Sequence, residues 1–289
     1  MLEIKELRKR FGDKVALDGV SLSARPGEVV GFVGANGAGK TTTMRIAMGV
    51  LASDSGEVVY KGAPLNAGRR NRFGYMPEER GLYPKMKVAE QIAYFGELHN
   101  LTRAQARKAT GELLEQLNLT DRADDHVQDL SLGNQQRVQL AVSLVHDPEV
   151  MILDEPFSGL DPIAVDVMGT ALKDRAARGV PVIFSSHQLD LIERLCDSVV
   201  IIAAGSVIAA GSVEELKARE TKRLRVRVET DQDLISDLPG TVTRDGDDYL
   251  IETADDQAVL HAAMSAGRVT HFAYDQPTIA EIFREAVAR

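Results

Sequence analysis

The sequence of 289 residues contains a single cysteine, Cys196, which excludes a disulfide within the chain. A chain without internal disulfides fits a reducing compartment. The setting of this cysteine, "IERLCDSVVII", is typical of a helix-to-strand transition. We therefore expect Cys196 to be a small buried hydrophobic residue and not a reactive thiol.

Long apolar runs are also absent. A membrane-spanning helix needs about 20 predominantly apolar residues. The strongest candidate, "SVVIIAAGSVIAAGSV" (residues 198–213), is interrupted by Gly205 and Gly211 and predicts a strand, a turn and a second strand. No cationic N-terminal region leads into an apolar stretch with a small-residue cleavage site, so we expect no secretory signal. The chain is not expected to cross a membrane by itself.

Basic residues are too few to balance the acidic ones. With 34 Lys and Arg against 43 Asp and Glu, the formal net charge is -9 at pH 7. This balance argues against broad attraction to nucleic-acid phosphates or anionic lipids, and no direct nucleic-acid partner is expected. The length is enough for a full core, and one large domain with a small one is the natural expectation.

Apolar runs and helical segments alternate as in an α/β fold. "EVVGFV" (residues 28–33) is nearly continuous in apolar residues, as in a strand buried on both faces. A glycine-rich loop and a helical pattern follow it, and "EVMILDEP", "VPVIFSSH" and "SVVIIAAG" are later strands separated by helical segments. This alternation predicts a mainly parallel sheet with helices on its faces and an antiparallel portion near the N-terminus.

Two changes of pattern indicate the domain organisation. Residues 87–146 are rich in Ala, Leu, Glu, Gln and Arg at roughly 3.6-residue spacing, which predicts a helical subdomain. Later, "RLRVRVE" alternates charged and apolar residues, and a hairpin signal surrounds residues 245–247. We therefore predict a first domain over residues 1–220 and a small C-terminal α+β domain over residues 221–289.

The loop after the first buried strand, "GANGAGKTT" (residues 34–42), fits the pattern G-x-x-x-x-G-K-[ST] between a predicted strand and a predicted helix. Its glycines let backbone N–H groups turn toward a polyphosphate, and the following helix presents its positive end to the same anion. Lys40 is expected to reach the β- and γ-phosphates, and the Thr41 hydroxyl to bind Mg²⁺. The pattern predicts a phosphate-binding loop.

Polar residues follow two of the later predicted strands. Asp154, at the exit of "VMIL", suits Mg²⁺ directly or through water, and Glu155 would then polarise a water for attack on the γ-phosphate. In isolation the same pair is typical of an exposed acidic turn before a proline. His187 follows "VPVIFSS", where it could hydrogen-bond a γ-phosphate or hold the attacking water, although a lone histidine is more often structural.

The stretch "DLSLGNQQRVQLAVSLV" (residues 129–145) predicts the start of an amphipathic helix with Ser131 as its N-cap. Together the motifs resemble the ATP-binding cassette (ABC) family over about residues 1–220. The phosphate loop, "YMPE" at the Q-loop position, "LSLGNQQ" at the signature position, "ILDEP", "SGLDP" at the D-loop position and "SSH" follow in the family's order. The resemblance implies a P-loop NTPase fold with an antiparallel β subdomain and a helical subdomain, and ATP hydrolysis with ATP and Mg²⁺ as cofactors.

The resemblance also implies roles for particular residues. Phe11 matches the aromatic residue that stacks on adenine, and Glu78 stands at the Q-loop position, where it joins Thr41 and Asp154 at the metal. Two domains would close head to tail around two ATP molecules, so that the signature of one copy meets the γ-phosphate held by the other. The implied catalytic residues are Glu155, His187 and Lys40. The implied nucleotide-binding residues are Phe11, Gly34, Ala35, Asn36, Gly37, Ala38, Gly39, Lys40, Thr41, Thr42, Ser131, Gly133 and Asn134, and the D-loop residues are Ser158, Gly159, Leu160 and Asp161.

The chain departs from the common family motifs at three positions. Leu132 and Asn134 replace a glycine and the glutamine of L-S-G-G-Q, and Glu78 replaces the Q-loop glutamine. A carboxylate at position 78 can still bind Mg²⁺ or a water but adds negative charge near the phosphates. The phrase "PEERGLYPKM" is similar to a branch of bacterial ABC-2-type exporters resembling sodium-efflux ATPases. The closing "PTIAEIFREAVAR" resembles the tail of exporter ATPases, including drug-resistance ones.

The leading hypothesis is an ATPase motor that forms a homodimer with ATP and drives a separate integral membrane permease for export. Such a subunit would be cytoplasmic, held at the inner face of the cell membrane through the permease. Residues 76–88 and the helical segment after them are expected to hold the docking surface. The alternative is a soluble ABC ATPase without a membrane partner, acting on nucleic acid, the ribosome or a cofactor-assembly complex. A third, non-hydrolysing regulator is disfavoured by the presence of Glu155.

Overall fold

The computed structural model describes residues 1–79, 81–219, 223–230, 233–253, 255–275 and 278–288. The chain divides into two compact units, Met1–Ser212 and Val213–Arg289. The sequence pattern placed this division at residue 220. The difference arises because helix α8 (Val213–Arg219) contacts α10 (Ile279–Ala288) and therefore belongs to the second unit.

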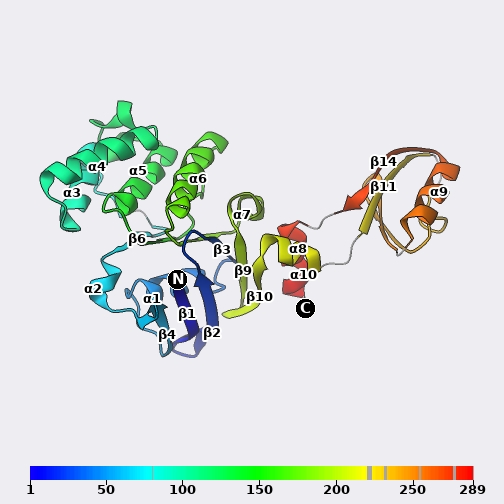
Figure 1. Ribbon diagram of the computed structural model, residues 1–289, viewed down its shortest axis with the longest axis horizontal. Helices are drawn as coiled ribbons and strands as arrows, with labels where there is room; N and C mark the ends of the chain where they lie inside the picture. The colour runs from blue at the N-terminus through cyan, green and yellow to red at the C-terminus, as the bar shows by residue number, and fades with distance from the viewer. Residues whose placement is uncertain (80, 220–222, 231–232, 254, 276–277, 289) are drawn as a thin grey trace. The chain divides into compact units, whose positions relative to one another are not determined.

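The first unit contains two sheets (Figure 1). One is antiparallel, in the order β2-β1-β4-β5. The other, in the order β10-β9-β3-β8-β7-β6, is parallel except for its edge strand β10. This arrangement confirms the predicted α/β fold. The strands are β1 Leu2–Phe11, β2 Lys14–Ala24, β3 Val29–Val33, β4 Ser55–Tyr60, β5 Ala63–Pro64, β6 Phe73–Met76, β7 Val150–Leu153, β8 Val182–Ser186, β9 Ser198–Ala203 and β10 Ser206–Ser212.

Three longer helices, α3, α4 and α5, lie between β6 and β7 in the chain and pack on one another, as predicted for residues 87–146 (Figure 1). Helix α5 also contacts β6 and α6. It begins after Ser131, whose hydroxyl oxygen accepts the N–H of Asn134 at 3.4 Å, so the predicted cap is confirmed. The helices of this unit are α1 Lys40–Ala47, α2 Ala67–Arg70, α3 Val88–Leu98, α4 Arg103–Gln116, α5 Leu132–Leu144, α6 Pro162–Ala177 and α7 Leu189–Leu195, with short 3₁₀ helices at Thr120–Arg122 and Val127–Asp129.

Strand β3 lies inside the parallel sheet and is buried on both faces. Val30 and Phe32 contribute to the core on one face. On the other face, a Cβ at Gly31 would lie 2.8 Å from Ile192 Cδ1 and 2.9 Å from Cys196 Sγ, so only glycine leaves room for α7. Cys196 is buried and forms no disulfide, as expected, and burial raises the pKa of its thiol well above the ordinary value.

The second unit contains an antiparallel sheet in the order β12-β13-β11-β14, with α9 packed on it. Its own core is formed by apolar side chains such as Val226 and Ile251 of the sheet and Val259 of α9. Among the described residues, no helix in either unit combines the length and apolar composition needed to span a membrane. The remaining elements are β11 Arg223–Glu229, β12 Thr241–Asp245, β13 Asp248–Glu252, α9 Asp256–Ala266 and β14 Arg268–Asp275.

Candidate functional site

The glycine-rich loop between β3 and α1 is shaped by close packing at its two ends. A Cβ at Gly34 would lie 2.5 Å from the carbonyl oxygen of Ile202. Gly39 has φ +113, and a Cβ there would lie 2.7 Å from Leu17 Cδ2. Helix α1 begins directly after Gly39, and no side chain caps it. The first N–H groups of the helix therefore face the space inside the loop without a side-chain acceptor, which is the usual setting for a bound anion.

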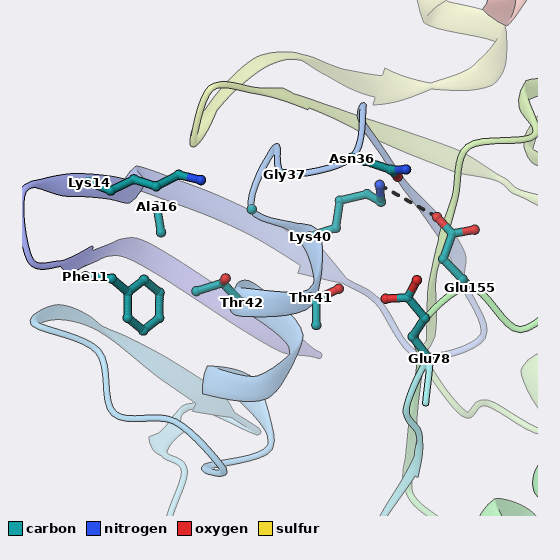
Figure 2. A pocket seen from close by; sticks show the side chains of 11 residues that line it. Phe11, Lys14, Ala16, Asn36, Gly37, Lys40, Thr41, Thr42, Glu78 and Glu155 are labelled. Atoms are coloured by element: carbon teal, nitrogen blue, oxygen red, sulfur yellow. Dashed lines mark ion pairs between the residues drawn. The ribbon is translucent and has the colours of Figure 1, made fainter. Parts of the chain in front are cut away.

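A cavity of about 320 Å³ opens at this loop, a volume within the range of small-molecule sites. Figure 2 shows Phe11 at one end of it, the phosphate loop along its length, and Glu78 and Glu155 at the other end. An elongated ligand with an aromatic end and an anionic end matches this distribution. The lining residues are Phe11, Lys14, Ala16, Asn36, Gly37, Gly39, Lys40, Thr41, Thr42, Glu78 and Glu155.

Lys40 joins the phosphate loop to the end of strand β7. Its ammonium donates a hydrogen bond to the carbonyl oxygen of Gly34 at 2.7 Å and lies 3.6 Å from Oε1 of Glu155 (Figure 2). Both side chains are buried. A phosphate bound by the Lys40 ammonium would therefore lie beside the Glu155 carboxylate. The loop and Glu155 thus border the same part of the cavity.

The carboxyl ends of β7 and β8 bring four polar residues together. Ser185 donates its hydroxyl to Oδ1 of Asp154 at 2.6 Å and accepts the backbone N–H of Glu155 at 2.8 Å. Oε2 of Glu155 lies 2.8 Å from Nδ1 of His187, whose side chain is half exposed. Because the strands are parallel neighbours, the residues that follow them meet at one edge of the sheet.

Asp154 has the chemistry of a cation ligand. Its side chain is 1% exposed, and Oδ2 is buried without a hydrogen-bond partner among the described residues. A buried carboxylate oxygen without a partner is unfavourable unless a cation or water contacts it. No group of three His, Cys, Asp or Glu side chains in the described ranges is arranged as a protein-only metal site. Asp154 and the Thr41 hydroxyl are oxygen donors of the kind that Mg²⁺ prefers, so these two residues could hold a divalent cation.

The predicted signature residues are not among those that line this cavity. Ser131 is exposed at the start of α5, and Asn134 accepts a hydrogen bond from the guanidinium of Arg137. The D-loop packs against this helix start, since a Cβ at Gly133 would lie 3.7 Å from Leu160 Cδ2. Asp161 accepts the N–H of Ala164 at 2.8 Å and so caps α6. The phosphate loop and the signature of one chain are thus separate surfaces.

Lys14 and Ala16 line the cavity, although the sequence motifs do not include them. Both lie on β2 just after the turn that follows Phe11. The sequence could have indicated them only through their position a few residues after Phe11. Ala38, by contrast, is buried against the core and supports the loop from behind.

Residues 17–158 match the family described as ABC transporter, and residues 211–287 match the family described as ATP-binding protein DrrA1-3-like, C-terminal domain. The uncharacterized ABC transporter ATP-binding protein YhaQ of Bacillus subtilis (strain 168) is 38% identical over 99% of this chain and 98% of its own length. The Nod factor export ATP-binding protein I of Paraburkholderia xenovorans (strain LB400) is 38% identical over 76% of this chain and 73% of its own length. A solved structure of an ATP-binding subunit of an ABC transporter is 30% identical, with a TM-score of 0.70, over 76% of this chain and 92% of that one.

The fold and the site therefore define an ABC ATPase, a class of domain that binds and hydrolyses ATP. The chain belongs to the family of ABC transporter ATP-binding proteins, and it carries the DrrA-like C-terminal domain. Its relatives include proteins named for export. It is thus the ATP-binding subunit of a transporter.

Proposed function

We propose that this subunit is the motor of an exporter: two copies close around two MgATP molecules and drive a separate membrane permease, which holds them at the inner face of the membrane. The observation that carries the proposal is the meeting of Lys40 and Glu155 in a cavity that has Phe11 at its far end. This arrangement supplies a ring surface for adenine, a cationic phosphate loop, and a carboxylate where the γ-phosphate would lie.

The residues divide the chemistry among them. Phe11 stacks on the base, residues 34–42 surround the phosphates, and Lys40 binds the terminal phosphates. Glu155 accepts a hydrogen bond from the attacking water, and its contact with His187 orients it. Thr41 and Asp154, with Glu78 nearby, hold Mg²⁺, which when bound neutralises charge on the phosphate oxygens.

The separation of the signature from the phosphate loop supports the proposed dimerisation. Ser131 and Gly133 lie at the start of α5 and do not line the cavity, so in the proposed dimer they would meet a γ-phosphate held by the other copy of the chain. The positive end of α5 favours that contact, at about 0.3–2 kcal/mol. ADP lacks the phosphate concerned, so hydrolysis would weaken the dimer and let it open.

An aromatic cluster supports docking of a permease. Tyr83, Tyr94 and Phe95 contact one another, with ring centroids 5.8–6.1 Å apart. Tyr83 is 48% exposed and Tyr94 40% exposed, next to the exposed Leu98. Exposed apolar patches with aromatic residues are typical of protein–protein contacts. The patch lies just after the Q-loop position in the sequence, since Tyr83 is five positions after Glu78.

Co-expression with a candidate membrane permease tests the docking. We expect the two proteins to co-purify, and Tyr94→Arg to abolish co-purification while ATP binding is unchanged. Val50→Arg, which alters another exposed apolar residue, serves as the matched control and should still co-purify. If every variant and the parent purify alone, the chain acts without this permease, and the soluble ABC ATPase becomes the better account.

A further inference from the structure

Helix α5 carries two buried glutamines whose amides reach the two loops that bear the cavity's carboxylates. Nε2 of Gln136 donates to the carbonyl oxygen of Pro156 at 3.4 Å, and Nε2 of Gln139 donates to the carbonyl oxygen of Pro77 at 2.7 Å. Pro156 directly follows Glu155, and Pro77 directly precedes Glu78. Three residues apart on a helix, the two glutamines lie on one face, so a single element contacts both loops.

Neither glutamine is explained by packing alone. Gln136 is 5% exposed and Gln139 4% exposed, and the Oε1 atom of each has no hydrogen-bond partner among the described residues. Burying an amide with an unsatisfied oxygen is unfavourable compared with an apolar side chain of similar shape. Each side chain does supply one hydrogen-bond donor to a particular backbone carbonyl, that of Pro156 or that of Pro77.

Glu155 is held in a backbone conformation that needs support. Its φ is +50, in the left-handed region that residues other than glycine rarely adopt. Ser185 fixes the N–H on one side of this residue, and Gln136 fixes the carbonyl of the next residue on the other. Met76 and Pro77 are held similarly, because the Asp154 N–H donates to the Met76 carbonyl at 2.8 Å beside the Gln139 contact.

We propose that Gln136 and Gln139 are positioning residues for ATP hydrolysis, which orient Glu155 and Glu78 through the backbone of the adjoining prolines. The inference rests on the proposed role of Glu155. It also gives α5 two roles, since the helix begins at the signature position and its middle contacts the loops that bear Glu155 and Glu78.

The test is steady-state ATP hydrolysis by Gln136→Met, with ATP affinity measured by calorimetry and unfolding followed by circular dichroism. Methionine keeps the volume and removes the donor together with the unsatisfied oxygen. Because a small misplacement of a catalytic group greatly lowers the reaction rate, we expect kcat to fall by about 10-fold or more, while ATP affinity and the melting temperature are retained. Gln139→Met, which frees the other loop, is the second variant and should act in the same direction.

Ser143→Ala is the matched control, because the Ser143 hydroxyl is buried in the same helix but donates to the carbonyl of Leu140, within the helix itself. It should leave kcat unchanged. The proposal is overturned if kcat of folded Gln136→Met and Gln139→Met equals that of the parent, or if kcat falls only in parallel with the melting temperature. Glu155→Gln distinguishes failure of this inference from failure of the proposed function. If Glu155→Gln loses turnover while Gln136→Met and Gln139→Met stay fully active, only the positioning role of Gln136 and Gln139 is rejected. If Glu155→Gln retains turnover, the role of Glu155 is rejected.

Discussion

The ammonium of Lys40 lies 3.6 Å from Oε1 of Glu155, although 115 positions separate them in the chain and different strands deliver them. The relationship arises because β3 and β7 are both parallel partners of β8, so the loops that follow them open at the same edge of the sheet. The ammonium that we propose binds phosphate and the carboxylate that we propose activates water thus lie at one position in the cavity.

Replacing Lys40 by alanine should weaken ATP binding by on the order of 100-fold, because the variant loses charge-assisted contacts to two phosphates. Isothermal calorimetry measures the effect directly. Lys14→Ala is the matched control, since Lys14 lines the same cavity but is exposed. Retained micromolar affinity in the Lys40 variant would contradict the assignment of the phosphate loop.

The change Glu155→Gln should lower kcat by about 10²–10⁴-fold, the usual contribution of a general base, while ATP still binds. Phosphate release in single-turnover assays gives the rate. Glu79→Gln is the appropriate comparison, because Glu79 is exposed and does not line the cavity, and this variant should retain turnover. Equal rates for the parent and the Glu155 variant would exclude this carboxylate as the base.

The contact between Leu132 and Gly159 gives a prediction about the signature and the D-loop of one chain. Gly159 has φ +70, and a Cβ there would lie 2.8 Å from Leu132 Cδ2. Gly159→Ala should therefore destabilise the protein by about 1–3 kcal/mol through backbone strain and overlap. Adding Leu132→Ala should restore part of this loss in urea unfolding. Strictly additive effects would mean that the two residues do not contact each other.

The stacked rings of His99 and His146 predict a pH dependence of stability. Their centroids are 3.7 Å apart, and Nε2 of His146 lies 3.2 Å from the carbonyl oxygen of Phe73. Burial, with a smaller contribution from His99, lowers the pKa of His146 from 6.5 to about 4. The unfolded chain therefore takes up this proton first, so the stabilisation is complete above pH 6.5 and is lost as pH falls toward 4.

Urea midpoints at pH 7 and pH 5 measure this effect. The single proton accounts for at most about 1.4 kcal/mol per pH unit within that window. His146→Gln should show a smaller loss of stability between the two pH values than the parent. His126→Gln, at an exposed position, should behave as the parent does. A parent-like pH response in the His146 variant would assign the acid sensitivity to other groups.

Local motifs with strand–loop–helix context were sufficient to predict much of this protein. The glycine spacing of residues 34–42 and the apolar strands before Asp154 and His187 predict both the parallel sheet and the edge at which its polar residues meet. The cap at Ser131 could likewise be read from a short segment, because an N-cap depends on residues only three positions apart.

Contacts between distant segments were not predictable from the same patterns. Nothing in "QQRVQ" distinguishes Gln136 and Gln139, which point into the protein, from a solvated polar face, because their partners Pro156 and Pro77 lie 20 and 62 positions away. The packing of Leu132 on Gly159 is similar: a departure from the family motif gained its meaning only from the loop beside it. The boundary between the two units also differs from the sequence-based position. Helix α8 contacts α10 and belongs to the second unit, although in the chain it directly follows β10 of the first unit.

The most direct test of the central claim is the mass of the Glu155→Gln protein in solution, measured by sedimentation with saturating MgATP or MgADP. One chain has a mass of 31.4 kDa. We predict twice this mass with ATP, the single-chain mass with ADP, and the single-chain mass for a Ser131→Arg, Glu155→Gln double variant that still binds ATP. A single-chain mass for Glu155→Gln with ATP bound would contradict the closure of two copies around shared nucleotides.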